Sequence, residues 1–531
     1  PAHIAVQGYL KLAAQGKYRE ALQLIKRENP FPAVCGRICN RRCEDACTRG
    51  TVDQAVAIDE VKRFIAQQDL DAATRFVPEK VIPKVDGAFD QQIAIIGGGP
   101  AGLSCAYYLA EKGYRPTVFE KERRLGGMLE NGLPSFRLEK DVVQAEIDVL
   151  REMGVQFRCG VEVGKDVTIA QLREQGYQGF YVAVGLQSGG RLNIPGDDAQ
   201  GVTAGIDFMR RVNGGQETKL EGRVVVIGGG NIAADVARTA VRCGAESVDL
   251  YCLESYDDMP MGPEDRGECE RDGITIHAGW GQTEIVTENG HAAGIRFRKC
   301  LRVKNDQGRF APEFDDNDTC QAQCAAVLYC IGQKVDWRQL LTGTAVTFNP
   351  NGTAQVDPMT YQTAEADIFA GGDAVTGQKF AIDAIAAGKE GAISLHRFVQ
   401  KAALTIGRNR RQFVELDKEN ALIPVGFDNT PRQRIGYNEA LRRTFRDERI
   451  AFTAQQVQKE TARCLSCGAS VVDPNKCIGC GVCTTKCAFD AIHLHRERPE
   501  CTHMIPAEDK MKAILPYMVK REIKIRKAGK K

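Results

Sequence analysis

Two stretches of the chain share one hydrophobic pattern: a short apolar run, a glycine-rich turn, an amphipathic segment and a second apolar run. They are residues 91–120 (QQIAIIGGGPAGLSCAYYLAEKGYRPTVFE) and 223–254 (RVVVIGGGNIAADVARTAVRCGAESVDLYCLE). Short apolar runs bounded by glycine are typical of buried parallel strands, and the segment between them has helical periodicity. The pattern therefore predicts two right-handed βαβ units.

Helical periodicity dominates the N-terminal part of the chain. Residues 2–28 predict two amphipathic helices broken at Gly16, and residues 55–68 predict another helix. Between them, VCGRICNRRCEDAC carries a cysteine at every fourth position, and we expect a loop there because Gly36 and charged residues interrupt it. A proline-punctuated linker at 77–90 ends this part.

Further elements follow the two βαβ units. Short apolar strands at 180–185 and 326–332 are expected to cross between the two modules. The stretch IFAGGD (368–373) predicts a strand that ends in Gly-Gly-Asp before a long helix. Residues 401–460 are polar and weakly patterned, so we expect a wrapping linker with short helices.

Composition narrows the class of protein. The 531 residues are too many for one hydrophobic core. A net charge of +2 gives no strong positive electrostatic potential that would attract nucleic acid or an anionic membrane. The apolar run Ile93–Ala110 contains three consecutive glycines and a proline, which indicates strand, turn and helix instead of a membrane span. The basic C-terminal tail is expected to be a solvated helix end. Because the chain opens on Pro1, we expect preceding residues to be missing.

Ten cysteines gather near the two ends of the chain. Tight spacing favours thiolate ligation in a reducing cytoplasm over disulfides, so a cytoplasmic protein is expected. The Cys-x2-Cys-x2-Cys-x3-Cys run has bacterial ferredoxin spacing, in which three thiolates hold one cubane and the fourth reaches a second one. Zinc is the competing metal for the first group, and the ferredoxin run favours iron–sulfur. The candidate ligands are Cys35, Cys39, Cys43, Cys47, Cys464, Cys467, Cys477, Cys480, Cys483 and Cys487.

The first glycine-rich turn fits G-x-G-x-x-G directly after a strand. Gly97 permits the tight turn, Gly99 lets backbone N–H groups approach a pyrophosphate, and Gly102 lets helix and strand pack closely. Glu120 closes the second strand, where an acidic group binds ribose hydroxyls. This stretch predicts a dinucleotide site.

The second turn has the same context. Its candidate residues are Gly228, Gly230, Asn231 and Ala233, with Glu254 at the end of the second strand. A carboxylate there hydrogen-bonds the 2′-hydroxyl of NAD and repels the 2′-phosphate of NADP. The alternative is an exposed glutamate at a strand end.

A reactive dithiol is missing from the sequence around the first turn, where Cys105 stands alone. A mechanism in which a flavin reduces a protein disulfide is therefore not expected. Electrons would instead leave one at a time through clusters.

These stretches, together with LGGM, GLPSFRL and NPFPAVCGRIC, resemble the small (beta) subunit of glutamate synthase. The same core is shared by the N-terminal half of dihydropyrimidine dehydrogenase and the large subunit of bifurcating ferredoxin–NADP transhydrogenase. The resemblance covers residues 1–400 and implies that the first module binds FAD, the inserted module binds NAD(P)H, and N-terminal [4Fe–4S] clusters carry electrons. By this resemblance FAD is held by Gly97, Gly99, Gly102, Glu120, Gly126, Gly127, Arg137, Gly372 and Asp373. The nicotinamide nucleotide faces Gly228, Gly230, Asn231, Glu254 and the strand end Cys330–Gly332.

Three departures from the family pattern matter. Members that use NADPH carry two arginines where this chain has Leu253 and Glu254, so NADH is the expected donor. The family's cysteine segment before the first helix is missing, so one N-terminal cluster lacks ligands in this sequence. The role of Cys35 stays open because it precedes the family's main ligands, and Lys62, with Glu60 close by, falls near the position of the family's non-cysteine ligand. A ferredoxin-like module is appended, in which Ala488 replaces the usual proline.

We therefore expect an α/β protein with two Rossmann-like dinucleotide-binding domains (FAD and NAD), an N-terminal helical iron–sulfur domain and a C-terminal 4Fe-4S ferredoxin-like domain. The expected ranges are 1–85 (helical iron–sulfur), 86–208 and 326–400 (FAD-binding), 209–325 (NAD(P)H-binding), 401–460 (linker), 461–500 (ferredoxin-like) and 501–531 (basic tail).

The expected function is a flavo-iron–sulfur oxidoreductase subunit that moves electrons from NADH to FAD, to two or more [4Fe–4S] clusters, and on to ferredoxin or a partner subunit. Cofactors carry the reaction, so no catalytic side chain is expected. The alternatives are a glutamate synthase-type small subunit that feeds an amidotransferase partner, and a non-catalytic electron-wiring subunit.

Overall fold

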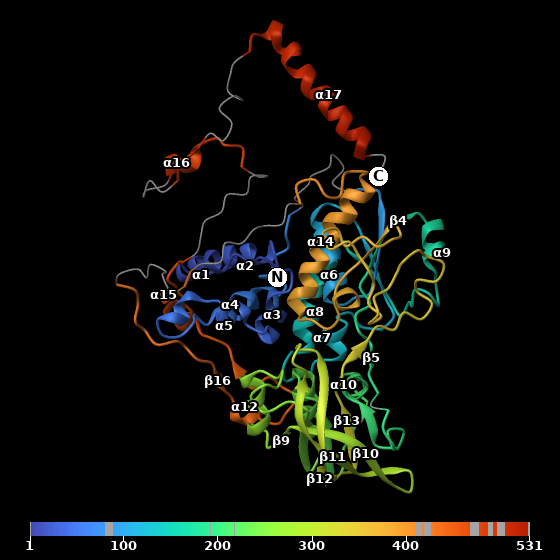
Figure 1. Cartoon of the computed structure of the whole chain (residues 1–531). Coiled ribbons are helices and arrows are strands. Elements are labelled where there is room, and N and C mark those ends of the chain that lie inside the picture. The colour runs from blue at the N-terminus through green and yellow to red at the C-terminus, as the bar shows by residue number, and fades with distance from the viewer. Residues whose placement is uncertain are drawn as a thin grey trace. The chain divides into compact units, whose positions relative to one another are not determined.

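The computed structural model describes residues 2–79, 89–191, 193–216, 218–408, 417–418, 426–467, 477–486, 492–495 and 505–528 (Figure 1). They belong to two compact units, Pro1–Gly468 and Ala469–Lys531, and each unit is described by itself.

The N-terminal part of the first unit is helical, and α1 and α2 are separated at Gly16 as the periodicity predicts. Its core is made by the apolar faces of α1, α2 and α5, with Tyr9, Leu22 and Ile65 fully enclosed. In chain order the elements are α1 (Val6–Ala14), α2 (Tyr18–Lys26), α3 (Pro32–Ile38), α4 (Arg42–Asp45), η1 (Thr48–Thr51), α5 (Ile58–Ala66) and η2 (Gln67–Asp69).

The cysteine segment differs from the expected loop, because α3 and α4 are helical within it. Gly36 lies inside α3, and a Cβ built there would come within 2.7 Å of the Arg63 Cα on α5. This glycine allows two helices to pack closely, so it is not the helix breaker that the sequence suggested. The loop prediction is wrong for these two short helices.

The first parallel sheet has the strand order β15-β4-β1-β2-β3. The order reverses at β1, and the first glycine-rich turn follows that strand, at the switch point where α/β proteins bind ligands. Helices α6 and α14 pack against each other beside this sheet. The elements are β1 (Gln92–Ile96), α6 (Pro100–Glu111), β2 (Thr117–Glu120), α7 (Met128–Asn131), α8 (Lys140–Glu152), β3 (Gln156–Cys159), α9 (Ile169–Glu174), β4 (Tyr177–Val182), β15 (Ile368–Ala370), α13 (Asp373–Thr376) and α14 (Ala381–Val399).

The second sheet is also parallel, in the order β6-β13-β7-β8-β9. Its β7-α11-β8 unit repeats the β1-α6-β2 unit, which confirms the two βαβ units and the α/β class. The elements are β6 (Val202–Ala204), α10 (Gly205–Asn213), β7 (Arg223–Ile227), α11 (Asn231–Arg242), β8 (Ser247–Cys252), α12 (Pro263–Arg271), β9 (Thr275–Ala278) and β13 (Ala326–Tyr329). The short pair β5 (Ser188–Gly189) and β14 (Gln333–Lys334) lies between the modules in sequence.

A three-stranded antiparallel sheet in this module was not predicted from the sequence. It comprises β10 (Trp280–Glu288), β11 (His291–Lys304) and β12 (Phe310–Gln323). Its apolar residues, such as Ile295 and Phe297, share a core with Val225 of the second parallel sheet. The sheet therefore covers one face of that module.

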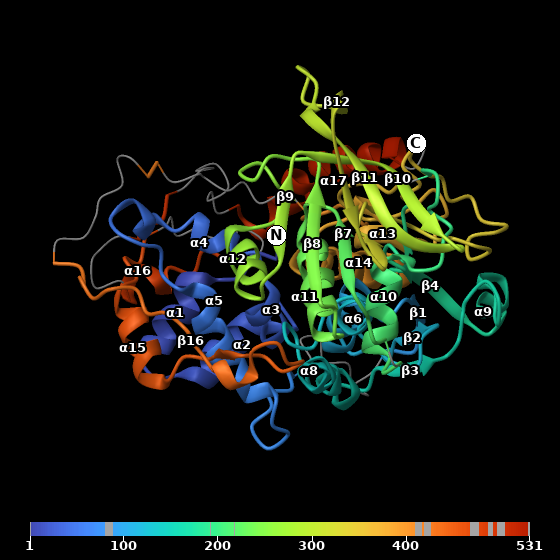
Figure 2. The same cartoon turned by 90° about the horizontal axis from the view of Figure 1, so that it is seen from below.

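The segment expected to be a wrapping linker contains β16 (Gly436–Tyr437), η3 (Glu439–Leu441), β17 (Arg449–Ile450) and α15 (Ala454–Ala462). Both views place α15 beside α1, and the two helices are in contact (Figure 1 and Figure 2). This part of the chain thus returns to the N-terminal helices after the nucleotide modules.

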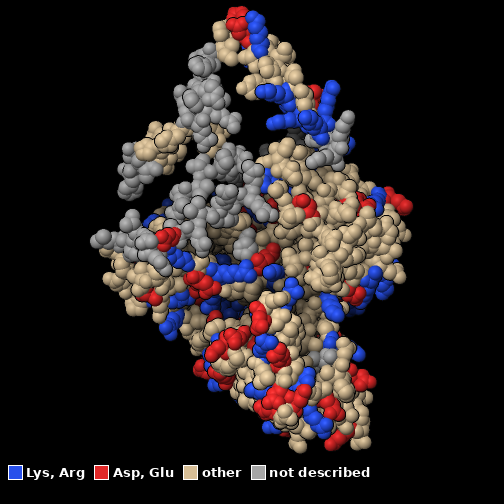
Figure 3. Space-filling view, in the orientation of Figure 1, with Lys and Arg blue, Asp and Glu red and all other residues tan. Residues whose placement is uncertain are grey.

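The second unit contains α16 (Val482–Lys486), η5 (Ala507–Asp509) and α17 (Lys510–Ala528). Its last helix carries exposed Lys and Arg side chains, whereas both signs of charge are interspersed over the visible face of the first unit (Figure 3). Among the helices of the described residues, none is sufficiently long and apolar to cross a bilayer.

A carboxyl group on α8 of the first nucleotide module caps the helix that carries the first cysteine. Glu146 of α8 is fully buried, and its two oxygens accept hydrogen bonds from Ala33 N (2.7 Å) and Val34 N (2.9 Å) at the start of α3. Burial raises the pKa of Glu146 to about 8. The contact joins the helical part to the first sheet through backbone groups that have no partner within their own helix.

Replacing Glu146 with alanine is expected to lower the free energy of unfolding by about 2–4 kcal/mol, because it leaves two buried amides unpaired and opens a cavity. Chemical denaturation measures the change. Glu152→Ala, a half-exposed position on the same helix, is the matched control and should cost less than about 0.5 kcal/mol. Equal effects of the two substitutions would contradict the capping role.

Candidate functional site

A cavity of about 810 Å³ lies in the first unit, where the helical part and both nucleotide modules meet; we call it the central cavity. Its wall includes Gly97 and Gly99 of the first turn, Asn231 of the second turn, and Cys39 from the cysteine segment. The volume lies in the range of cofactor and ligand pockets. One cavity therefore brings together residues predicted for three different cofactors.

The first glycine-rich turn has the backbone that the motif requires. Gly97 has φ +109°, and a Cβ there would meet the Ala183 carbonyl oxygen at 2.4 Å. A Cβ at Gly102 would meet the Gly97 carbonyl oxygen at 2.0 Å, so only glycine allows α6 to start this close to β1. Gly99 precedes the first turn of α6, whose free N–H groups favour an anion at the cavity edge.

Glu120 ends β2 beside this turn and lines the central cavity. Its Oε2 accepts a hydrogen bond from Gly98 N at 2.7 Å, and its Oε1 accepts one from Glu122 N at 2.9 Å. Burial raises the pKa of the Glu120 carboxyl. The carboxylate is thus held at the edge of the pocket, where its predicted contact with a ribose remains a prediction.

A second glycine pair supports the turn from the other side. Gly126 N donates to the Gly98 carbonyl oxygen at 2.8 Å, and both Gly126 and Gly127 have positive φ. A Cβ at Gly127 would lie 2.9 Å from the Gly99 Cα. The two loops therefore approach so closely that only glycine fits at their contact.

The Gly-Gly-Asp stretch reaches the same place from β15. Gly372 has φ +69°, and a Cβ there would lie 2.9 Å from the Ala101 Cβ at the start of α6. Asp373 lines the central cavity, and burial raises its pKa to about 6. This part of the chain completes the wall around the N-terminus of α6.

Arg137 also lines the central cavity, but its guanidinium faces the second module. Its Nη1 lies 2.9 Å from Asp235 Oδ1 and 3.0 Å from Asp265 Oδ1. Although burial opposes it, these two carboxylates raise the pKa of Arg137 above its usual value. The ion pairs join the two nucleotide modules, and the assignment of Arg137 to FAD remains a prediction.

The second turn repeats the geometry of the first. Gly228 has φ +139°, and a Cβ there would meet the Cys330 carbonyl oxygen at 2.7 Å. A Cβ at Gly229 would lie 2.7 Å from Glu254 Oε2, much as a Cβ at Gly98 would lie 3.1 Å from the Glu120 carboxylate. The two acidic residues therefore occupy matching positions in the two modules.

The remaining nucleotide candidates lie around this turn. Asn231 starts α11, and its Oδ1 accepts a hydrogen bond from Gly262 N at 3.4 Å. Ala233 is buried in the same helix, and Gly332 has φ +79° just beyond β13. Space is open at Gly230, where a built Cβ would meet no atom within 4 Å. A bound pyrophosphate fits such an opening at a helix N-terminus.

Replacing Gly230 with alanine is expected to leave the free energy of unfolding within about 0.5 kcal/mol of wild type, because the Cβ meets no protein atom. Nicotinamide nucleotide binding should weaken at least about ten-fold, because the methyl group occupies the space where backbone approaches the pyrophosphate. Isothermal titration of the purified chain measures it. Gly99→Ala is the matched control, which should impair FAD retention instead; wild-type nucleotide affinity of Gly230→Ala would contradict the site.

The N-terminal cysteines divide between two surroundings. Cys35 is buried in α3, and Cys39 follows that helix at the wall of the central cavity. The charge of Lys62, which is buried and paired with Asp59, acts on the thiols of Cys35, Cys39 and Cys43. Although burial lowers it, Asp59 and the thiols raise the pKa of Lys62, so the ammonium stays charged and is not a metal ligand.

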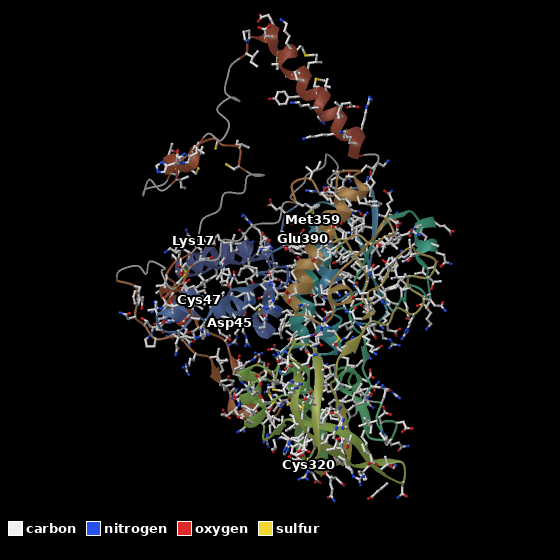
Figure 4. The ribbon with its side chains drawn as sticks, in the orientation of Figure 1. Lys17, Asp45, Cys47, Cys320, Met359 and Glu390 are labelled. Atoms are coloured by element: carbon white, nitrogen blue, oxygen red, sulfur yellow. The ribbon has the colours of Figure 1, made fainter. Side chains whose placement is uncertain are left out.

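Cys47 lies just beyond α4, and Figure 4 labels it with Asp45 in the helical part. In the second unit, the predicted ligands Cys477, Cys480 and Cys483 are exposed, and Cys487 lies outside the described residues. Within the ranges that the structure describes, no three His, Cys, Asp or Glu side chains surround a point that suits a single metal ion. A cubane is wider than one ion and takes soft thiolates, so the cysteine groups suit a cluster.

Residues 447–449 belong to the site, although no motif marked them. All three line the central cavity. Arg449 donates to the carbonyl oxygens of Arg37 (3.0 Å) and Arg137 (2.8 Å), and it pairs with Asp447 at 2.9 Å. Asp447 also pairs with Arg63 of α5 at 2.9 Å. This arginine thus ties the helical part to the first nucleotide module at the wall of the central cavity.

Family models match three parts of the chain, and these parts follow one another along the sequence as the predicted iron–sulfur, nucleotide-binding and ferredoxin-like domains do. The model described as pyridine nucleotide-disulphide oxidoreductase matches residues 91–388, which is more than half of the chain. Dihydropyrimidine dehydrogenase domain II, 4Fe-4S cluster, matches residues 1–74, and a 4Fe-4S binding domain matches residues 470–493.

Curated relatives share most of this length. NADP(+)-dependent formate dehydrogenase subunit beta of Moorella thermoacetica is 33% identical, over 88% of this chain and 69% of its own. Glutamate synthase [NADPH] small chain of Halomonas elongata is 33% identical, over 73% of this chain and 84% of its own. NADPH-Fe(3+) oxidoreductase subunit beta of Geobacter sulfurreducens is 29% identical, over 88% and 74%.

Among solved structures, Mycobacterium tuberculosis FprA in complex with NADPH matches 59% of this chain and 85% of its own, with a TM-score of 0.51 and 17% identity. This likeness shows the fold of the two nucleotide modules. The chain belongs to the pyridine nucleotide-disulphide oxidoreductase family, as a glutamate synthase small chain-like FAD/NAD(P) oxidoreductase with an N-terminal 4Fe–4S region of the dihydropyrimidine dehydrogenase type and a C-terminal 4Fe–4S motif.

Proposed function

We propose that this chain is the subunit of a cytoplasmic redox complex that takes electrons from NADH and delivers them, through FAD and [4Fe–4S] clusters, to ferredoxin or a partner subunit. The observation that carries the proposal is the central cavity, whose wall includes Gly97 and Gly99 of the first turn, Asn231 at the end of the second turn, and Cys39. Because the donor site, the flavin site and a cluster ligand lie at one cavity, each electron transfer between them covers a short distance. The names of the relatives, which are beta subunits and small chains, support a multi-subunit setting.

The residues of the first module hold and orient the flavin in this proposal. The N-terminus of α6 receives the pyrophosphate, Glu120 binds the ribose, and the two separate loops that carry Gly127 and Asp373 close around them. When bound, FAD supplies the conversion between a two-electron hydride and single electrons. The chain itself supplies position and exclusion of water, so no side chain acts as acid or base.

Glu254 supports the choice of NADH over NADPH. The relatives named above carry NADPH or NADP(+) in their names, so the preference is a property proposed for this chain alone. A carboxylate beside Gly229 stands where a 2′-phosphate would lie, and it accepts a hydrogen bond from a free 2′-hydroxyl.

Cys39 supports the exit of electrons toward the helical part. It lies at the cavity wall, where a cluster that it ligates would adjoin the flavin site. The buried ammonium of Lys62 lies among the neighbouring thiols and offsets the negative charge of thiolates and cluster.

Anaerobic mixing of the purified full chain with NADH tests the proposal. The flavin absorbance should bleach, and electron paramagnetic resonance should then detect reduced clusters in the same sample. A flavin that stays oxidised with both NADH and NADPH would refute donor oxidation and favour an electron-wiring role. A bleached flavin with clusters that stay oxidised would refute the proposed exit path.

A further inference from the structure

The segment that carries Cys464 and Cys467 is fastened to the N-terminal helical part of the first unit. Arg463, 1% exposed in its side chain, donates to the Gln54 carbonyl oxygen at 2.6 Å and to Asp53 Oδ1 at 3.0 Å. Arg49 returns a hydrogen bond from its Nη1 to the Arg463 carbonyl oxygen at 3.1 Å. These contacts link the residue before Cys464 to the turns that directly follow Cys47.

Two further contacts hold the same segment on both sides. Glu460 of α15 is fully buried, and its Oε1 accepts a hydrogen bond from Ala57 N at 2.8 Å. Gln7 of α1 donates from Nε2 to the Cys467 carbonyl oxygen at 2.9 Å. The buried, charge-assisted hydrogen bond of Glu460 fixes the helix that precedes Cys464, and the exposed contact of Gln7 holds Cys467 beside α1.

Cys464 of this segment shares its surroundings with Cys47 of the helical part. Cys47 and Cys464 pack against the core of α1, α2 and α5, and Cys464 interacts electrostatically with Cys467 and Cys47. Cys43 contacts the same core, but its charged neighbours are Lys62, Asp59 and Cys39. The four N-terminal cysteines are thus divided, and Cys47 belongs with the two cysteines from the far end of the sequence.

The backbone between Cys464 and Cys467 turns at a residue with unusual geometry. Ser466 has φ +54°, in the left-handed region, and its N–H donates a hydrogen bond to the Cys464 sulfur. Amide hydrogen bonds to cysteine sulfur stabilise thiolates in clusters and tune their potential. Strain of this kind in a residue other than glycine persists only where the surrounding structure maintains it.

We propose that Cys47, Cys464 and Cys467 supply three of the ligands of one [4Fe–4S] cluster built on the N-terminal helical part. This site is distinct from the one at Cys39 and Cys43, and from the ferredoxin-like run at Cys477–Cys483. The cluster would join the segment that follows α15 to the N-terminal helical part within the first unit, and would take part in electron transfer there. Its role in electron transfer rests on the proposed function, whereas its ligand set does not.

Iron counting in single and double variants of the full chain, purified without oxygen, tests the ligand set. Cys464→Ser and Cys47→Ser should each lose about four irons per chain, the content of one cubane, with the matching signal in the reduced spectrum. The double variant Cys47→Ser/Cys464→Ser should lose no more than either single one. Cys464→Ser/Cys480→Ser should lose about twice as much, because the two residues serve different clusters.

Cys159→Ser is the matched control, since this thiol is exposed at the end of β3, and its iron content should equal wild type. Retained FAD shows that each variant folds, and Cys467→Ser provides a second position if Cys464→Ser does not. An additive loss in Cys47→Ser/Cys464→Ser, or no additional loss in Cys464→Ser/Cys480→Ser, would overturn the assignment. So would unchanged iron in both Cys464→Ser and Cys467→Ser, or zinc in place of iron.

These measurements separate this inference from the proposed function. The iron pattern can hold while NADH fails to bleach the flavin, in which case only the function fails. If the flavin bleaches and the iron pattern is absent, only the ligand set fails.

Discussion

Gly102→Ala is expected to release most of the bound FAD and to lower the free energy of unfolding by about 3 kcal/mol or more. The added Cβ would lie 2.0 Å from the Gly97 carbonyl oxygen, which is backbone that cannot rotate away. The helix α6 must then move off the strand, and its N-terminus leaves the central cavity. Flavin content per chain and chemical denaturation measure the two effects.

Gly267→Ala is the matched control, because it adds the same methyl group to a glycine inside another helix, α12. A Cβ there meets no atom within 4 Å, so helix propensity should raise stability by about 0.5–1 kcal/mol and leave the flavin in place. A Gly102→Ala protein with wild-type flavin content and stability would contradict the close packing that the structure shows.

Glu254→Arg is expected to reverse or abolish the preference for NADH. In the wild type, NADH should reduce the flavin at least about ten-fold faster than NADPH at limiting nucleotide, a difference of about 1.4 kcal/mol or more. The arginine removes the repulsion and offers a bidentate partner to the 2′-phosphate, so the ratio should fall by about ten- to hundred-fold. Stopped-flow reduction with each nucleotide gives the ratio.

Glu288→Arg makes the same change of charge at the exposed end of β10 and should leave the ratio unchanged. This control distinguishes a direct effect of residue 254 on the 2′-phosphate from an effect of the module's net charge. Equal rates of flavin reduction by NADH and NADPH in the wild type would show that Glu254 does not select the nucleotide.

The nucleotide modules could be predicted from the sequence because their requirements are local. Gly97, Gly102 and Gly228 each stand where backbone approaches backbone, and the motif records that need directly. The same local interpretation of glycine gave a wrong prediction at Gly36, where it indicated a loop. The structure shows a helix pressed against Arg63, a contact between distant residues that local pattern does not encode.

The antiparallel sheet and residues 447–449 of the central cavity were not predictable, because they too depend on contacts between residues that are distant in the sequence. Strands β11 and β12 carry many exposed polar side chains, so their alternation is weak outside the residues that meet the second sheet. Arg449 lies in a charged stretch with no periodicity, and its role depends on two carbonyl oxygens hundreds of residues away. The division of the N-terminal cysteines likewise depends on α15, which returns late in the chain.

The hydrogen bond from Arg449 to the Arg137 carbonyl oxygen spans 312 positions of sequence, and this sets an order for assembly. A ribosome that adds about 5–20 residues per second makes residue 449 roughly 15–60 s after residue 137. Both nucleotide modules are completed within that interval, before residues 447–449 of the cavity wall have been synthesised. A nascent chain is therefore expected to retain flavin firmly only after β17 has been synthesised and docked.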